Sequence, residues 1–343
     1  MDASTWRVEP GSSTRSPLDL AKSAEALLPI EAKISWVEFP LTPDEVVQLN
    51  YQLVSKSVDG ESDGYSVLLN PYTAQITGTR LSEPGADLSA TPLIPLLFKL
   101  HYSLLLGESG GTFLGVTASL LLFSVLTGLI LWWPLGGKWR QAFVIKRKTS
   151  SERRLFDIHK TLGFYHALVL MVLLVSGIAM NLPANFNALV EAFSPLNLAE
   201  QTYSRPIDGQ LPINWGLAAQ IADSRYPDGK LAWLIAPKSE LGIYQVCKSG
   251  VPLMVGIQGY RCVWIDQYNQ DILQVIDATT GSIGDILLQW QWPLHSGRAL
   301  GWLGRILVFM TGLVCPVLYI TGVMRWQQKR RAAKLHQTKK TPA

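Results

Sequence analysis

Histidines are the residues of this 343-residue chain whose positions point most directly to chemistry. Only five occur, and four of them, His101, His159, His166 and His295, lie beside or within long apolar segments. Histidine inside a membrane is costly, so it usually faces a cofactor, a proton path or a cavity there. Neutral imidazole is a common axial ligand of b-type heme iron. These four residues are therefore the candidate cofactor-binding and metal-ligating residues, and no catalytic residue is singled out.

Spacing limits how the four histidines could share iron. His159 and His166 are seven residues apart, which places both on one helix face, about 10 Å apart along the axis. One iron cannot bind both, so they would serve different hemes, or one of them is a packing residue. His101 and His295 each follow a Leu and precede a Gly-rich segment, so two equivalent units could place one imidazole on either side of a heme plane. The alternative for each histidine is an ordinary hydrogen bond near the membrane surface.

Cysteine usage and motif searches exclude several other chemistries. The three cysteines form no CxxCH pattern and are too few for a four-cysteine iron–sulfur cluster. Cys247 and Cys262 flank an expected hairpin outside the cytoplasm, and we predict a disulfide between them. Neither a GxGxxG segment after a strand nor a Walker motif occurs, so no nicotinamide or ATP site is predicted. Electrons would have to come from a quinol or from a separate cytoplasmic donor.

Three apolar segments are long enough to cross a bilayer as helices. They lie in residues 109–137, 161–182 and 302–325. Small residues recur in them, namely Thr127 and Gly128, Ser176 and Gly177, and Thr321 and Gly322. Such residues let a cofactor or a neighbouring helix approach, and ordinary close helix packing explains them equally well. The sequence therefore predicts a membrane α-helical bundle.

Basic residues predict the orientation, because loops retained in the cytoplasm carry an excess of Lys and Arg. Residues 138–160 hold eight basic and two acidic side chains, and residues 325–343 hold seven basic and no acidic ones. The loop 138–160 and the tail 326–343 are therefore predicted to be cytoplasmic. Residues 1–108 and 183–301 would then form two extracytoplasmic α+β lobes.

Short apolar runs bounded by turn residues predict the elements of both lobes. Helices are predicted over 42–54, from a Thr and a Glu at capping-box spacing, and over 213–224. The predicted strands are 34–42, 65–70, 231–237, 242–248 and 260–267.

The two lobes also repeat one another. The segments 67–80 and 263–275 both contain an apolar strand, an amide or acidic residue, a Tyr two positions later and a second strand. The next histidine follows 31 residues after Asn70 in the first copy and 29 residues after Asp266 in the second. The duplicated unit is therefore predicted to include the hairpin, the histidine and the span that follows.

Four segments carry a resemblance to the PepSY-associated transmembrane family. They are NPYTAQITG, LHYSLLLGESGGTFLGVTASLLLFSVLTGLILWWP, RRLFDIHKTLGFYHALVLMVLLVSGIAM and HSGRALGWLGRILVFMTGL. The resemblance runs through most of residues 65–343. It implies a bacterial inner-membrane protein with two periplasmic PepSY-like lobes and two b-type hemes. By motif position, His101, His159, His166 and His295 would be the heme ligands.

The sequence departs from the family pattern at its beginning. Family members start with a transmembrane helix that has its own histidine near the cytoplasmic face. Residues 1–35 hold neither a signal peptide nor a span that could deliver the first lobe outside. We therefore expect a preceding helix, which would give four spans and supply a further inner ligand.

Some family members reduce ferric siderophores on the periplasmic side, and the resemblance implies this activity here. One electron would convert Fe³⁺ to Fe²⁺ and release the iron. The expected partners are a ferric siderophore, membrane lipid and a quinol or cytoplasmic electron donor, with no nucleic acid. Two alternatives stay open, a non-enzymatic PepSY-type binding or regulatory membrane protein and a siderophore permease.

Overall fold

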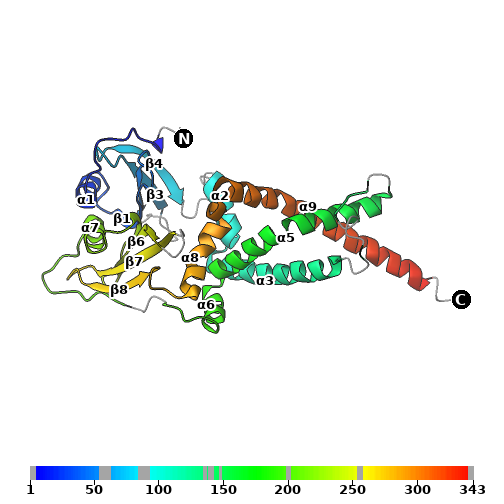
Figure 1. The fold of residues 1–343 in the computed structure, drawn as a ribbon. Coiled ribbons are helices and arrows are strands. Elements are labelled where there is room, and N and C mark those ends of the chain that lie inside the picture. The colour runs from blue at the N-terminus through cyan, green and yellow to red at the C-terminus, as the bar shows by residue number, and fades with distance from the viewer. Residues whose placement is uncertain are drawn as a thin grey trace. The chain divides into compact units, whose positions relative to one another are not determined.

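The fold is given by a computed structural model, in which two compact units are present (Figure 1). The structure describes residues 5–53, 63–83, 93–133, 137, 143–146, 149–197, 202–252 and 258–338. One unit contains Met1–His101 and Val190–Ile286 and holds the β-sheet. The other contains Tyr102–Leu189 and Leu287–Ala343 and is helical.

The sheet unit is built from two similar halves. The first half consists of α1 (Pro17–Glu25), β1 (Lys33–Glu38), β2 (Val47–Leu53), β3 (Asp63–Leu69) and β4 (Ile76–Glu83). The second consists of α7 (Trp215–Arg225), β5 (Lys230–Ile235), β6 (Ile243–Pro252), β7 (Gln258–Asp266) and β8 (Ile272–Asp277). Each half is therefore a helix followed by a four-stranded antiparallel meander.

The two halves join edge to edge through β1 and β5. The strand order is β4-β3-β2-β1-β5-β6-β7-β8, and β1 and β5 pair antiparallel with Val37 opposite Leu234. Trp36, just before Val37, and Trp233, just before Leu234, stack with their ring centroids 6.2 Å apart and their planes 4° from parallel. The two lobes predicted from the sequence are thus halves of one continuous sheet rather than separate bodies.

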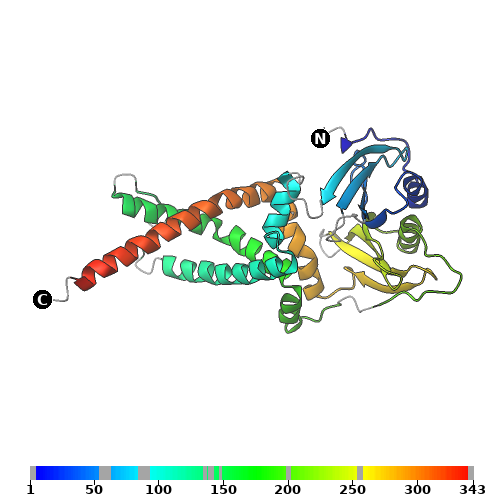
Figure 2. The same ribbon diagram turned by 180° about the vertical axis from the view of Figure 1, so that it is seen from behind.

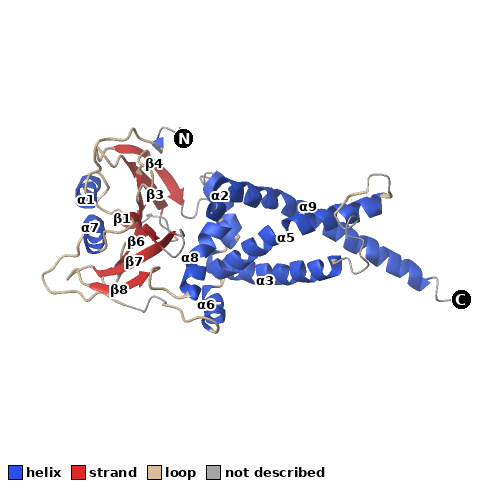
Figure 3. Ribbon diagram, in the orientation of Figure 1, coloured by secondary structure: helices blue, strands red, loops and turns tan. Residues whose placement is uncertain are grey.

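Helices α1 and α7 cover the same face of the sheet and pack against each other (Figure 3). Trp215 at the start of α7 is buried with the apolar residues of the central strands. Next to it, a Cβ on Gly216 would lie 2.4 Å from the carbonyl oxygen of Pro17, so only glycine permits this close approach of α7 to α1. A single core therefore serves both halves.

The helix predicted over 42–54 is wrong, because most of this segment forms β2. Its buried side chains are Val47, Leu49 and Tyr51. They alternate with more exposed polar residues, which is the period of a strand with one buried face. The Glu at capping-box spacing, Glu45, does accept a hydrogen bond from the Thr42 amide at 3.2 Å, but the pair closes a turn before the strand.

The other elements predicted in the lobes are confirmed, with shifts at their ends. The helix over 213–224 is α7, and the five predicted strands are β1, β3, β5, β6 and β7. The sequence did not indicate α1, which begins where the Ser16 side chain accepts a hydrogen bond from the Asp19 amide and Pro17 occupies the first turn.

The repeated hairpins predicted at 67–80 and 263–275 are confirmed down to their turns. Asn70 accepts hydrogen bonds from the amides two and three residues later, at 2.8 and 3.2 Å. Asp266 accepts the equivalent bonds at 2.7 and 3.2 Å. The residue four positions later has a positive φ in both copies, 62° at Ala74 and 69° at Gln270.

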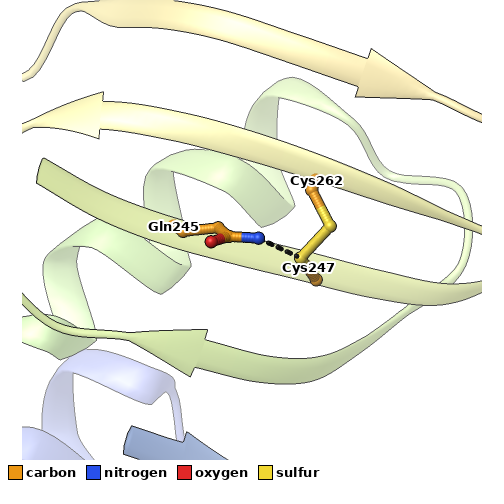
Figure 4. The surroundings of a disulfide bond; sticks show 3 residues. All are labelled: Gln245, Cys247 and Cys262. Carbon is orange, nitrogen blue, oxygen red and sulfur yellow. Dashed lines mark hydrogen bonds between the residues drawn. A yellow bond between two sulfur atoms is a disulfide. The ribbon is translucent and has the colours of Figure 1, made fainter. Parts of the chain in front are cut away.

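The predicted disulfide between Cys247 and Cys262 is present (Figure 4). The two residues lie directly opposite each other on β6 and β7, with a Cα–Cα distance of 4.1 Å. The Gln245 amide nitrogen donates a hydrogen bond to the Cys247 sulfur at 3.5 Å. The bond therefore links neighbouring strands of the second half.

The helical unit contains three helices long and apolar enough to cross a membrane within the described part of the chain. They are α3 (Gly107–Trp132), α5 (Ser151–Asn181) and α9 (Gly301–Thr338). In both ribbon views α5 lies alongside α3 and α9 (Figures 1 and 2), and it packs against each. At most 17% of each apolar window is buried, as expected for side chains whose solvent is lipid.

Three further helices connect these parts of the chain. They are α2 (Leu93–Ser103), which precedes α3, α6 (Pro183–Glu191), which follows α5, and α8 (Ile283–His295), which precedes α9. The predicted spans 161–182 and 302–325 are confirmed as helices, and 109–137 is confirmed as far as Trp132, since residues 134–136 lie outside the described residues. Helix α5 begins at Ser151, inside the segment predicted as the cytoplasmic loop 138–160. Residues 138–142 and 147–148 of that loop lie outside the described residues.

Candidate functional site

Three of the four candidate histidines bind a hydroxyl group on a neighbouring helix. The Nδ1 atom of His159 on α5 lies 2.8 Å from the Oγ1 of Thr321 on α9. His166 on α5 makes the same contact with Thr311 on α9, at 3.0 Å. The third contact joins Nδ1 of His295, the last residue of α8, to Oγ of Ser176 on α5, at 2.8 Å.

These contacts follow one another along α5. His159 and His166 both reach α9, which agrees with the predicted placement on one face of their helix. Their partners Thr321 and Thr311 are separated along α9 in the reverse order, as antiparallel packing requires. With a rise of 1.5 Å per residue, the contacts at 159, 166 and 176 extend over about 25 Å of α5.

Small residues accompany the imidazole rings. A Cβ on Gly322 would lie 3.4 Å from Cε1 of His159, and a Cβ on Gly177 would lie 3.7 Å from Cε1 of His295. An added Cβ at either position would therefore be in van der Waals contact with the ring. Of the three pairs of small residues noted in the sequence, Ser176–Gly177 and Thr321–Gly322 contact histidine.

The residues present in the helical unit fit a heme. The porphyrin supplies four iron ligands, so the protein needs to add only one or two imidazoles at each iron, and single histidines suffice. Between His159 and His166 in the sequence, the buried Thr161 Oγ1 has no hydrogen-bond partner among the described residues, so it is available to a bound group.

His101 lies on α2 and belongs to the sheet unit, so the contacts above concern the other three histidines. The turn that follows it nevertheless repeats the turn after His295. Gly107 and Gly301, each six residues after its histidine, have φ values of 59° and 58°. The pairing of His101 and His295 at one iron stays a prediction.

The close packing after each histidine is also duplicated. A Cβ on Gly110 would lie 1.7 Å from the Ser103 carbonyl oxygen, and a Cβ on Gly304 would lie 2.1 Å from the Gly297 carbonyl oxygen. Both glycines stand nine residues after a histidine, and the residues whose carbonyl oxygens approach them stand two residues after the same histidine. The predicted duplication of the segment from the hairpin through the histidine to the span is therefore confirmed.

A buried carboxylate organises the end of α5 near His159. Asp157 is fully buried and lies 3.3 Å from the Arg153 side chain and 3.2 Å from the Lys160 side chain. It also accepts a hydrogen bond from the Lys146 amide at 3.2 Å. Its charge is thus compensated by two cations and a backbone donor, which attaches the basic segment before α5 to the helix.

The sequence reasoning missed the residues that hold the histidines. Ser176 and Thr321 were noted only as small residues, and Thr311 was not singled out. A usable signal exists in the sequence: each of the three hydroxyls is followed directly by glycine, and Thr311 and Thr321 are ten residues apart. The histidine partners, however, are 119 to 162 residues away in the chain.

Fold and site together define a multi-span membrane protein with an α+β sheet unit and with histidines that contact its long apolar helices. The chain matches the family described as the PepSY-associated TM region over residues 1–329 and belongs to that family. No curated protein matches the chain.

Proposed function

We propose that this chain is a b-type heme protein of the bacterial inner membrane that passes electrons outward to reduce a ferric siderophore. The observation that carries the proposal is the series of three imidazole rings along α5. His159 and His166 belong to α5 itself, and His295 reaches it from α8. Family membership supports the same reading. The excess of basic residues around α5 and α9 would place the Ser151 end of α5 in the cytoplasm.

In this reading the histidines bind heme and the surrounding residues orient them. His159 and His166 would belong to the inner part of the membrane and His295 to the outer part, with His101 a further candidate ligand in the repeated segment. When bound, heme supplies one-electron redox chemistry at iron. The helices keep the imidazoles at fixed intervals and shield them from water.

The chemistry of the substrate fits a one-electron reductase. Siderophores hold Fe³⁺ through hard oxygen ligands, and the same oxygens hold the larger, less charged Fe²⁺ far less well. One electron delivered to the chelate would convert Fe³⁺ to Fe²⁺ and release the iron. The electron would come from a quinol or a cytoplasmic reductase, and the sheet unit would lie on the periplasmic side with the substrate.

A difference spectrum of the detergent-purified full chain tests the proposal. We expect the reduced-minus-oxidised spectrum and a pyridine-hemochrome assay to reveal b-type heme, and the dithionite-reduced protein to be reoxidised by a ferric hydroxamate chelate. Alanine substitutions at His159, His166 and His295 should each lower the heme content, whereas His336→Ala in the basic tail should not. A wild-type chain purified without heme would overturn the proposal and favour the non-enzymatic binding protein.

A further inference from the structure

The three hydroxyls that contact histidine share one local arrangement. Each donates its proton to the carbonyl oxygen four residues earlier in its own helix. The distances are 2.7 Å from Ser176 to Val172, 2.8 Å from Thr311 to Leu307 and 2.7 Å from Thr321 to Val317. All three residues are at most 5% exposed, so water does not compete for these bonds.

This arrangement decides which nitrogen of each imidazole carries the proton. A hydroxyl has a single hydrogen, and here it is directed to the backbone carbonyl. Toward the histidine the oxygen therefore offers a lone pair, and Nδ1 must be the donor. A neutral imidazole has only one N–H, so Nε2 is left unprotonated in all three rings. An unprotonated ring nitrogen is the form that binds a metal.

We infer that Ser176, Thr311 and Thr321 are positioning residues that hold His295, His166 and His159 with Nε2 directed to heme iron. The inference rests on the proposed function and deepens it. Hydrogen bonds to the outer nitrogen of a ligating histidine fix the ring orientation and raise the basicity of the ligand. They are also one of the means by which a protein sets the reduction potential of heme.

The internal repeat supplies a matched control for this role. Helix α3 occupies the position of α9 in the first copy, and its Thr127–Gly128 pair stands in register with Thr321–Gly322, at the same distance from the glycine that begins each helix. Thr127 also donates to a carbonyl four residues earlier, at 3.0 Å. Among the hydrogen bonds of the described residues, however, it has no histidine partner. The same hydroxyl-to-carbonyl bond within the helix therefore exists with the imidazole at Thr321, which is buried, and without it at Thr127, which is less buried.

Substitutions at Thr321 in the heme-loaded full chain test the inference. Thr321→Val keeps the shape and the β-branching of the side chain but removes the acceptor for His159. We expect heme affinity to fall by roughly tenfold and the midpoint potential of one heme to become more positive, because the weakened imidazole donates less charge to ferric iron. Thr321→Ser should restore both properties, and Thr127→Val should match the wild type.

The measurements are heme content by pyridine hemochrome, a spectroelectrochemical titration and the low-spin signals in electron paramagnetic resonance. Size-exclusion chromatography reports whether each variant is folded, and Ser176→Ala at the His295 contact provides a second test if Thr321→Val does not fold. Wild-type potentials and spectra in folded Thr321→Val, or in folded Ser176→Ala, would overturn the positioning role while leaving the heme proposal intact. Absence of heme from the wild type would instead contradict the proposed function.

Discussion

At the scale of single residues, Asp285 shows how a carboxylate stabilises the start of a helix in the sheet unit. It is 4% exposed and forms a reciprocal capping pair with Ser282, at 2.8 and 3.1 Å. It also accepts two hydrogen bonds from Asn197, at 2.8 and 2.7 Å. Burial would raise the pKa of Asp285, but the hydrogen bonds from Asn197 and Ser282 outweigh it and hold this pKa below the usual value.

We expect Asp285→Asn to destabilise the sheet unit by about 1–3 kcal/mol at neutral pH, because its amide cannot accept all three hydrogen bonds that the carboxylate accepts. A depressed folded-state pKa contributes stability that is complete above the unfolded value of 3.8 and is lost as pH falls through the lower, folded value. Thermal unfolding of the purified chain, followed by tryptophan fluorescence, should show a wild-type advantage that is constant down to about pH 4 and shrinks below it. An advantage that did not change with acidification would contradict this assignment.

At the scale of elements, the two turns that follow the histidines determine how α3 and α9 begin. Gly110 and Gly304 each allow a backbone carbonyl to approach within a distance that no Cβ would tolerate. We expect Gly110→Ala and Gly304→Ala to move the preceding turn and to lower the thermal stability of the helical unit, by about 2 kcal/mol or more. The midpoint of aggregation on heating, measured by fluorescence-detected size-exclusion chromatography, checks this.

Each of these variants has a control in its own helix. Among the described residues, and apart from the adjacent backbone of its own helix, nothing lies within 4 Å of a Cβ added to Gly128 in α3 or to Gly312 in α9. Gly128→Ala and Gly312→Ala should therefore be neutral or slightly stabilising, since Ala is the better helix former. If Gly110→Ala and Gly304→Ala were as stable as Gly128→Ala and Gly312→Ala, the close approach at the turns would not contribute to the stability of the helical unit.

At the scale of the whole molecule, the charge distribution predicts the orientation in the membrane. Leu211 in the sheet unit is 85% exposed, and Arg154 near the start of α5 is also exposed. In a Cys315→Ala background, we expect a membrane-impermeant maleimide to label Leu211→Cys in intact spheroplasts. The same reagent should label Arg154→Cys only after lysis.

The parent Cys315→Ala protein serves as the background control. Its remaining cysteines, Cys247 and Cys262, are joined in a disulfide and should not react until a reductant is added. Labelling of Arg154→Cys in intact spheroplasts, with Leu211→Cys protected, would reverse the proposed orientation. The sheet unit would then lie in the cytoplasm, away from any periplasmic chelate.

Much of this architecture could be predicted from local patterns. Spans are recognisable because a membrane helix must be apolar along its whole length, and the repeated hairpins are recognisable because Asn70 and Asp266 determine their own turns. The error over 42–54 arose where a local helix-start signal competed with strand alternation. Burial of Val47 and Leu49 in the sheet core decided that competition.

By itself, then, the sequence determined the three spans, the duplicated hairpins, the disulfide pair and the four histidines worth testing, because each depends on residues close together in the chain or on residue type alone. The tertiary structure decided that β1 and β5 join the halves in one sheet. It also decided that Ser176, Thr311 and Thr321 are the partners of histidine, with 119 to 162 residues between the bonded groups. Such contacts depend on which faces of distant elements pack together, and no local periodicity encodes that choice.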